Sequence, residues 1–135
     1  MDTTSYWIDS AALPRFPKPH SDLKVDAVVI GGGITGITAA YLLKHAGLTV
    51  ALIERDRFAR IDTGNTTAHL TSVTDLRLHE MLKLYGAESA RAVWDAGGAA
   101  IDQIVSIIRA EDIKCDFQWV PGYLHAPLFG ANAKS

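Results

Sequence analysis

The chain has 135 residues, 48% of them hydrophobic, which is enough to bury the core of one domain. Its net charge of −2, with both signs interspersed, excludes the basic surface typical of nucleic-acid-binding proteins. No apolar stretch is long enough to span a membrane, and the residues after Met1 do not resemble a signal peptide. The single cysteine, Cys115, excludes an internal disulfide and fits a reducing cytoplasm; we expect it to be a buried, inert thiol.

Residues 1–24 are expected to form an irregular N-terminal arm. Three prolines interrupt any periodic pattern there: Pro14, Pro17 and Pro19. Apolar residues are spread among them: Tyr6, Trp7, Leu13 and Phe16. We therefore expect the arm to pack on the surface of the domain that follows, rather than to act as a recognition motif.

The clearest signal lies at residues 25–54. The apolar run 25–30 predicts a parallel strand buried on both faces, and residues 49–53 predict a second strand. Between them, a glycine-rich turn at residues 31–36 is followed by a helix-like run to Ala46. Strand, glycine-rich turn, helix and strand in this order predict a βαβ dinucleotide-binding unit.

Each glycine of the turn has a physical role in such a unit. Gly31 permits the tight turn after the strand, and Gly33 lets the backbone approach a pyrophosphate closely. Gly36 lets the helix lie tightly against the sheet. The backbone N–H groups of Ile34 and Thr35, at the positive end of the helix dipole, are then expected to face the anion.

An acidic residue, Glu54, ends the second strand at the place where a carboxylate accepts hydrogen bonds from ribose hydroxyls. A carboxylate there would repel a 2′-phosphate, which favours an unphosphorylated adenosine ribose over NADP. The alternative is a purely structural βαβ turn without a ligand, and the pattern alone admits either FAD or NAD.

Helical periodicity returns after a polar passage. A stripe of apolar residues predicts a helix with Thr74 or Asp75 as its N-cap and Gly86 as its stop; the stripe is Leu78, Met81, Leu82 and Tyr85. A longer helix is expected over about residues 88–110. The pair Gly97-Gly98 inside it indicates either a kink or a close approach.

The last patterned stretch is short. Residues 117–120 and 123–126 read as two strands around Pro121-Gly122, a β-hairpin. Residues 127–135 show no pattern and are expected to form an irregular tail.

Several segments together resemble the N-terminal portion of the D-amino-acid oxidase/glycine oxidase family of FAD-dependent oxidoreductases. They are Val28 to Gly36, the Glu54-Arg55 pair, Thr63-Gly64-Asn65-Thr66-Thr67-Ala68-His69-Leu70-Thr71, and Val120-Pro121-Gly122-Tyr123-Leu124. The opening Tyr6-Trp7-Ile8-Asp9-Ser10 is similar to a bacterial branch whose members often carry a C-terminal Rieske iron–sulfur domain. The resemblance covers about residues 5–126.

The resemblance implies FAD as cofactor and a small-molecule amine or amino acid as substrate, whose C–H beside nitrogen gives a hydride to the flavin. It assigns the pyrophosphate to Gly31, Gly33, Ile34 and Gly36, the adenosine ribose to Glu54, and the neighbourhood of the adenine to Arg55. Thr66 and Thr67 would lie in a loop beside the pyrophosphate and the flavin edge. For His69, a hydrogen-bonding role is favoured over covalent attachment of FAD, and both remain open.

Family members are considerably longer, and their later part supplies further strands and the substrate-binding residues. Only two parallel strands are predicted in this chain, whereas a doubly wound sheet usually has about five or six. We therefore expect an α/β fold: a Rossmann-like βαβ dinucleotide-binding unit followed by helices and a β-hairpin, incomplete relative to the full fold. Residues 25–126 would be the FAD-binding region with the start of the substrate domain.

No catalytic residue or metal ligand can be assigned. His79-Glu80 begins like a zinc-protease helix, but Lys83 stands where the second histidine is needed. No Rieske pattern of cysteine and histidine is present, and in flavoenzymes the cofactor carries the difficult step. Three hypotheses remain: part of an FAD-dependent amine or amino-acid oxidoreductase, an NAD-binding domain, or a truncated, catalytically silent fragment. The last would bind FAD weakly or not at all and tend to aggregate.

Overall fold

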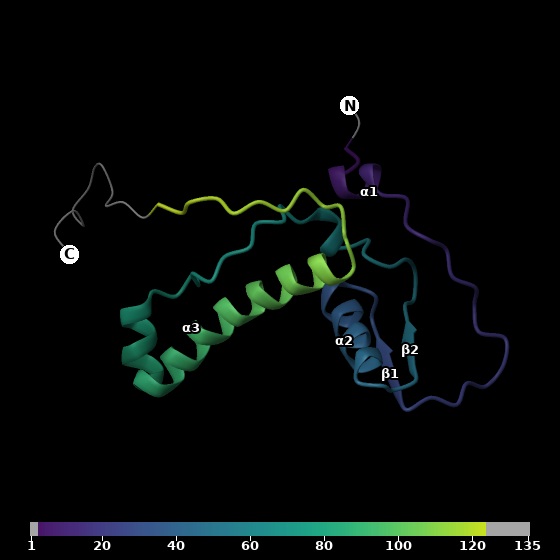
Figure 1. The fold of residues 1–135 in the computed structure, drawn as a ribbon, viewed down its shortest axis with the longest axis horizontal. Coiled ribbons are helices and arrows are strands. Elements are labelled where there is room, and N and C mark those ends of the chain that lie inside the picture. The colour runs from purple at the N-terminus through teal and green to yellow at the C-terminus, as the bar shows by residue number, and fades with distance from the viewer. Residues whose placement is uncertain (1–2, 124–135) are drawn as a thin grey trace. The chain divides into compact units, whose positions relative to one another are not determined.

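A computed structural model describes residues 3–123 of the chain (Figure 1). The chain divides into two compact units, residues Met1–His69 and Leu70–Ser135. The elements of the first unit are α1 (Tyr6–Ser10), β1 (Ala27–Ile30), α2 (Ile34–His45), β2 (Val50–Ile53) and the 3₁₀ helix η1 (Thr63–Asn65). The second unit contains the long helix α3 (Leu78–Ala110).

The first unit is built on a two-stranded parallel sheet. β1 and β2 pair from Ala27 opposite Val50 to Ile30 opposite Ile53, and α2 connects them. Helix α2 packs against both strands. The predicted order of strand, helix and strand is therefore present, although both strands are shorter than the sequence pattern suggested.

One face of this sheet is uncovered. Val28 is 55% exposed and Ile30 is 85% exposed, while the alternating residues Ala27 and Val29 are partly buried. The expectation that both faces of β1 are buried is thus wrong for the described residues. The reason is that α2 covers one face, whereas α1, the other α-helix of residues 3–69, packs against η1.

A side-chain clamp joins the starts of the two strands. The Asp26 carboxylate accepts hydrogen bonds from the Thr49 amide at 2.9 Å and from the Thr49 hydroxyl at 2.6 Å. These bonds, the hydroxyl first, lower the pKa of Asp26 from its usual value. An ionised Asp26 therefore helps to hold the two strands in register where they begin.

Helix α3 is interrupted at Gly86, as predicted. Gly86 has φ 80° and ψ 168°, so two helices meet there. The predicted N-cap is wrong, because α3 begins after Arg77, whose amide donates to a Glu80 carboxylate oxygen at 3.1 Å. The Thr74 hydroxyl instead donates to the Leu76 carbonyl at 2.7 Å, before the helix begins.

The Gly97-Gly98 pair marks a close approach and not a kink. The only non-helical backbone angles inside α3 are those of Gly86. A Cβ atom on Gly97 would lie 3.4 Å from Ser72, in the segment before the helix, whereas one on Gly98 would meet no atom within 4 Å. Gly97 therefore lets that segment lie directly on the helix surface. No helix among residues 3–123 is long and apolar enough to cross a membrane.

The predicted β-hairpin is not formed within the described residues. Residues 117–120 have no strand structure, and most of the second predicted strand, at 123–126, lies outside the described residues. The rings of Phe117 and Trp119 pack edge to face, with centroids 5.5 Å apart. Phe117 and Trp119 thus pack on each other within a single segment. Their alternating spacing is typical of a strand, but the segment has no pairing partner among residues 3–123. The predicted tail at 127–135 also lies outside the described residues.

Candidate functional site

The turn after β1 depends on the backbone freedom of Gly31. Gly31 has φ +103°, a conformation that side-chain-bearing residues rarely adopt. Its amide donates to the Ile53 carbonyl at 2.8 Å, which continues the pairing of the two strands by one residue. The chain can then turn sharply from β1 into α2.

The start of α2 lies directly on this turn. A Cβ atom on Gly36 would lie 1.9 Å from the Gly31 carbonyl oxygen and 3.5 Å from a methyl carbon of Val29. Only a glycine fits, so the close helix packing expected at Gly36 is present. At Gly33 an added Cβ would meet only the Thr63 hydroxyl, at 3.4 Å, so space remains beside the helix N-terminus.

Gly32, the middle glycine of the turn, has a structural role that the sequence reasoning missed. It is buried, and a Cβ atom there would lie 2.4 Å from the ring of Phe58. The Gly32 carbonyl also accepts a hydrogen bond from the Ala59 amide at 2.8 Å. The segment after β2 therefore packs on the turn, and the large apolar Phe58 in a mostly polar passage was the available signal.

The first amide of α2 is bound by a residue from a distant segment. The N-cap, Gly33, has no side chain that could accept this hydrogen bond. Instead, the Ile34 amide donates to the Thr63 hydroxyl at 3.0 Å. That hydroxyl still has its own proton to donate, so it could hold an anion at the helix N-terminus. The family resemblance places the segment that begins at Thr63 beside the pyrophosphate, but the bond from the Ile34 amide to Thr63 was not predicted.

The Glu54 carboxylate also lies at the glycine turn. One of its oxygens accepts a hydrogen bond from the Asp56 amide at 2.9 Å, and the other accepts one from the Gly32 amide at 2.7 Å. These bonds, that from Asp56 first, lower the pKa of Glu54 from its usual value. Each carboxylate oxygen has capacity to accept a further hydrogen bond, such as one from a ribose hydroxyl.

The remaining predicted site residues are not joined to the turn by any hydrogen bond found in residues 3–123. Arg55, Thr67 and His69 are exposed. Thr66 accepts a hydrogen bond from the Ala68 amide at 3.1 Å through its hydroxyl, and one from the Trp7 indole at 2.7 Å through its carbonyl. The structure thus gathers residues 31–36, Glu54 and Thr63 around the start of α2. The cofactor roles of all ten predicted residues stay predictions.

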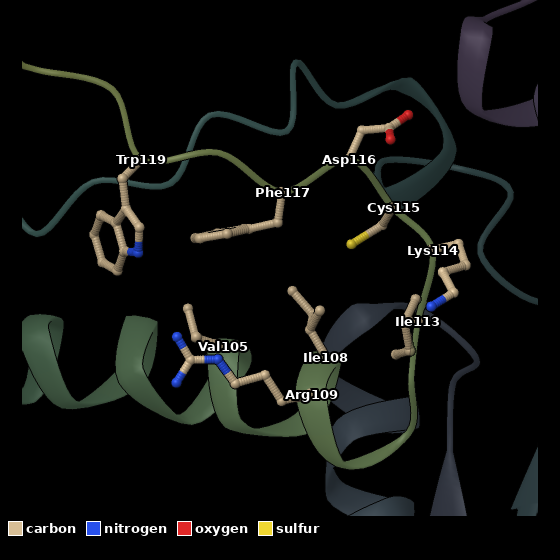
Figure 2. A pocket seen from close by; sticks show the side chains of 9 residues that line it. All are labelled: Val105, Ile108, Arg109, Ile113, Lys114, Cys115, Asp116, Phe117 and Trp119. Atoms are coloured by element: carbon tan, nitrogen blue, oxygen red, sulfur yellow. The ribbon is translucent and has the colours of Figure 1, made fainter.

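The second unit has a cavity of about 400 Å³ that contains none of the predicted site residues. Phe117 and Trp119 extend from one segment toward Val105, Ile108 and Arg109 of α3 (Figure 2). The other residues that line the cavity are Ile113, Lys114, Cys115 and Asp116. Cys115 is exposed, so the expectation of a buried thiol is wrong. The reason is that its segment leaves the end of α3 without a strand to cover it.

Comparison with known proteins agrees with the sequence resemblance. Residues 26–134 match the DAO family, described as FAD dependent oxidoreductase. The chain is 38% identical over 121 residues to YhfW of Bacillus subtilis, which is named as a Rieske 2Fe-2S iron–sulfur protein. It is 28% identical over 127 residues to gamma-glutamylputrescine oxidoreductase of Escherichia coli, and 30% identical over 111 residues to OrdL of Rhizobium meliloti, which is named as an oxidoreductase.

These alignments cover most of this chain but only part of each relative. They span 90%, 93% and 82% of the chain, against 24%, 29% and 26% of the three relatives in the same order. The chain therefore spans about a quarter of the length of these relatives. No solved structure matches it significantly. Because the family match extends over most of its length, the chain belongs to the DAO family of FAD-dependent oxidoreductases, and its cofactor is FAD.

Proposed function

We propose that this chain is the FAD-binding part of an oxidoreductase that oxidises an amine or amino acid at a C–N bond. The observation that carries the proposal is the glycine turn 31–36 at the start of α2, with Glu54 and Thr63 both hydrogen-bonded to its backbone. In a Rossmann-like unit this position binds the adenosine diphosphate half of the cofactor.

The pyrophosphate would bind at the N-terminus of α2. Gly31 and Gly33 leave space there, since an added Cβ would meet nothing at Gly31 and only the Thr63 hydroxyl at Gly33. The donors would be the Thr35 amide and the Thr63 hydroxyl, whose oxygen accepts the Ile34 amide, and the helix dipole would reinforce them. These donors are uncharged, and the positive end of the helix dipole would face the negative charge of the pyrophosphate.

The ribose would bind at Glu54. Its low pKa keeps the carboxylate ionised, and its two backbone bonds hold it at the turn. An ionised carboxylate accepts ribose hydroxyls and repels a 2′-phosphate, so NADP is disfavoured. Arg55 would lie near the adenine. An NAD-binding domain would use the same acid, and the family membership favours FAD over it.

Thr66, Thr67 and His69 would form the loop that passes from the pyrophosphate toward the flavin. Their exposure leaves these side chains accessible to a ligand. We propose a hydrogen-bonding role for His69, with covalent attachment to FAD as the alternative. A flavin that stays in the supernatant after acid precipitation would support the first role, and a flavin that coprecipitates would support the second.

One relative supports the proposed substrate class. The Escherichia coli relative is named gamma-glutamylputrescine oxidoreductase. When FAD is bound, it supplies a hydride acceptor for a carbon next to nitrogen. The residues of this chain would bind and orient the dinucleotide half. We assign none of them to the substrate. The YhfW relative supports a Rieske domain as an electron-transfer partner in a longer protein.

By itself, the 135-residue chain is proposed to be catalytically silent and to bind FAD weakly. The uncovered face of β1, where Val28 and Ile30 are more than half exposed, supports this. Parallel strands are normally buried on both faces, so such a surface favours aggregation and leaves the site poorly held. A monodisperse, yellow preparation of this length that an amine reduces would refute this part of the proposal.

The test is reconstitution with FAD or NAD of the purified chain, and of a longer protein that contains it where the gene encodes one. We expect the longer protein to take up FAD, to absorb near the flavin bands, and to be bleached by an amine or amino acid under anaerobic conditions. Binding of NAD without flavin would contradict the proposal. If neither an amine nor an amino acid bleaches the bound flavin, only the substrate assignment is refuted.

A further inference from the structure

The N-terminal arm contacts the loop around η1 at several points. The Ser5 hydroxyl donates to the carbonyl of Gly64, a buried residue 59 positions later. Carbon atoms of the Ile8 side chain would lie 3.2 Å from a Cβ on Gly64. The match to the family model begins at residue 26 and does not include the arm.

A second contact comes from Trp7, the neighbour of Ile8 in α1. The Trp7 indole nitrogen donates to the Thr66 carbonyl at 2.7 Å. Thr66 follows η1 with extended backbone angles, φ −73° and ψ 154°. The bond therefore fixes the direction in which residues 66–69 leave η1. The ring of Tyr6 packs edge to face on that of Trp7, with centroids 5.0 Å apart.

A third contact links the arm to the glycine turn. The Phe16 ring packs edge to face on Phe58, with centroids 5.1 Å apart. Phe58 in turn lies against Gly32, where an added Cβ would be only 2.4 Å from its ring. The arm therefore reaches both segments of the candidate site: the turn that begins α2, and the loop that supplies Thr63.

From these contacts we infer that residues 5–16 are a positioning element for the dinucleotide site. Rigid placement of the Thr63 hydroxyl on the Ile34 amide requires that η1 be held, and α1 is the helix packed against η1. The expected consequence, tighter FAD binding, rests on the proposed function. The positioning of η1 by the arm does not depend on it. Trp7 and Ser5 act through the loop and do not contact the ligand.

The test compares Trp7→Phe with Trp119→Phe in the whole chain. Trp7→Phe keeps an aromatic ring but removes the indole donor, whereas Trp119 lies in the second unit and serves as the matched control. Amide hydrogen exchange is followed at Ile34, Asn65 and Ala68, whose N–H groups are bonded to Thr63, Asp62 and Thr66. We expect Trp7→Phe to raise exchange there roughly fivefold, the factor for loss of one neutral hydrogen bond. Strand amides in β1 should not change.

The measured exchange rates either support or overturn the positioning role of residues 5–16. Unchanged exchange at these three amides, or a lack of protection already in the wild-type chain, would overturn the inference. If Trp7→Phe also loosens β1, Ser5→Ala takes its place, with the same expectation. In any protein that contains this chain and binds FAD, Trp7→Phe should weaken FAD binding by a similar factor. Faster exchange in a protein that never binds FAD would refute the proposed function but leave the positioning role intact.

Discussion

The hydroxyl oxygen of Thr63 lies 3.0 Å from the amide nitrogen of Ile34 and accepts its hydrogen bond. The two residues are 29 positions apart, and the bond satisfies the first free donor of α2. A residue of the loop after β2 thus completes the helix N-terminus that Gly33 leaves without a side chain. The site is therefore assembled from two segments, the turn 31–36 and the loop that begins at η1.

Replacing Thr63 by valine tests the role of this hydroxyl. Thr63→Val keeps the shape but leaves the Ile34 amide without its acceptor, so we expect a loss of about 1 kcal/mol in the free energy of unfolding. Thr63→Ser retains the hydroxyl and serves as the control, with at most a small loss. Urea denaturation followed by circular dichroism measures both. Equal stabilities of the two variants would contradict the assignment.

Glu54 is expected to hold both the turn and the ribose. In any protein that contains this chain and binds FAD, Glu54→Ala should weaken FAD binding by about tenfold to a hundredfold, because charge-assisted hydrogen bonds are lost. Asp22→Ala, which removes an exposed acid of the arm, should leave the affinity unchanged. Fluorescence titration of the apoprotein gives both dissociation constants. An unaltered affinity in Glu54→Ala would show that the ribose binds elsewhere.

Acid should destabilise the first unit through Glu54 and Asp26. Both have lowered pKa values in the folded chain, from ordinary values of 4.5 and 3.8, so the unfolded state binds protons more readily. Their contribution to stability is therefore present above about pH 4.5 and is lost as the pH falls through the folded-state values. Urea midpoints measured from about pH 6 to about pH 3, a range that spans ordinary carboxyl pKa values, give the slope of stability against pH. Glu54→Gln combined with Asp26→Asn should flatten it, and an unchanged slope would contradict the expectation.

Gly36 should not tolerate even a methyl group. The Cβ of Gly36→Ala would lie 1.9 Å from a backbone oxygen, which forces the helix away from the turn, so we expect a loss of about 3 kcal/mol or failure to fold. Gly98→Ala in α3 is the matched control, because its Cβ meets nothing within 4 Å. That change should stabilise the chain by about 1 kcal/mol, the helix propensity difference. Similar effects of the two substitutions on the urea midpoint would rule out the close contact at Gly36.

The sequence predicted those features that are encoded locally. The 31–36 glycines, the apolar strands and the stop at Gly86 each follow from backbone geometry or periodicity within a short window, and the structure contains them. The position of Glu54 after the second strand also followed from its spacing, although its bonds to Gly32 and Asp56 did not. Local pattern was sufficient for the backbone of the site.

Features that depend on long-range contacts could not be predicted. Thr63 reaches Ile34, and Trp7 reaches Thr66, across separations of 29 and 59 residues, and no local pattern specifies such pairs. The first strand of the predicted hairpin, at 117–120, is absent for the related reason that strand formation needs a pairing partner, and these residues have none among residues 3–123. An alternating apolar pattern indicates a strand only when a sheet is available to receive it.

The central claim is that the adenosine diphosphate half of FAD binds at the N-terminus of α2. Titration of the ¹⁵N-labelled chain with FAD, followed by amide chemical shifts, tests this directly even when binding is weak. We predict progressive shifts at Ile34, Thr35 and Gly36, reproduced by ADP but not by NADP. Shifts confined to amides outside the turn 31–36 and the segment 54–67, or an equal response to NADP, would contradict the account.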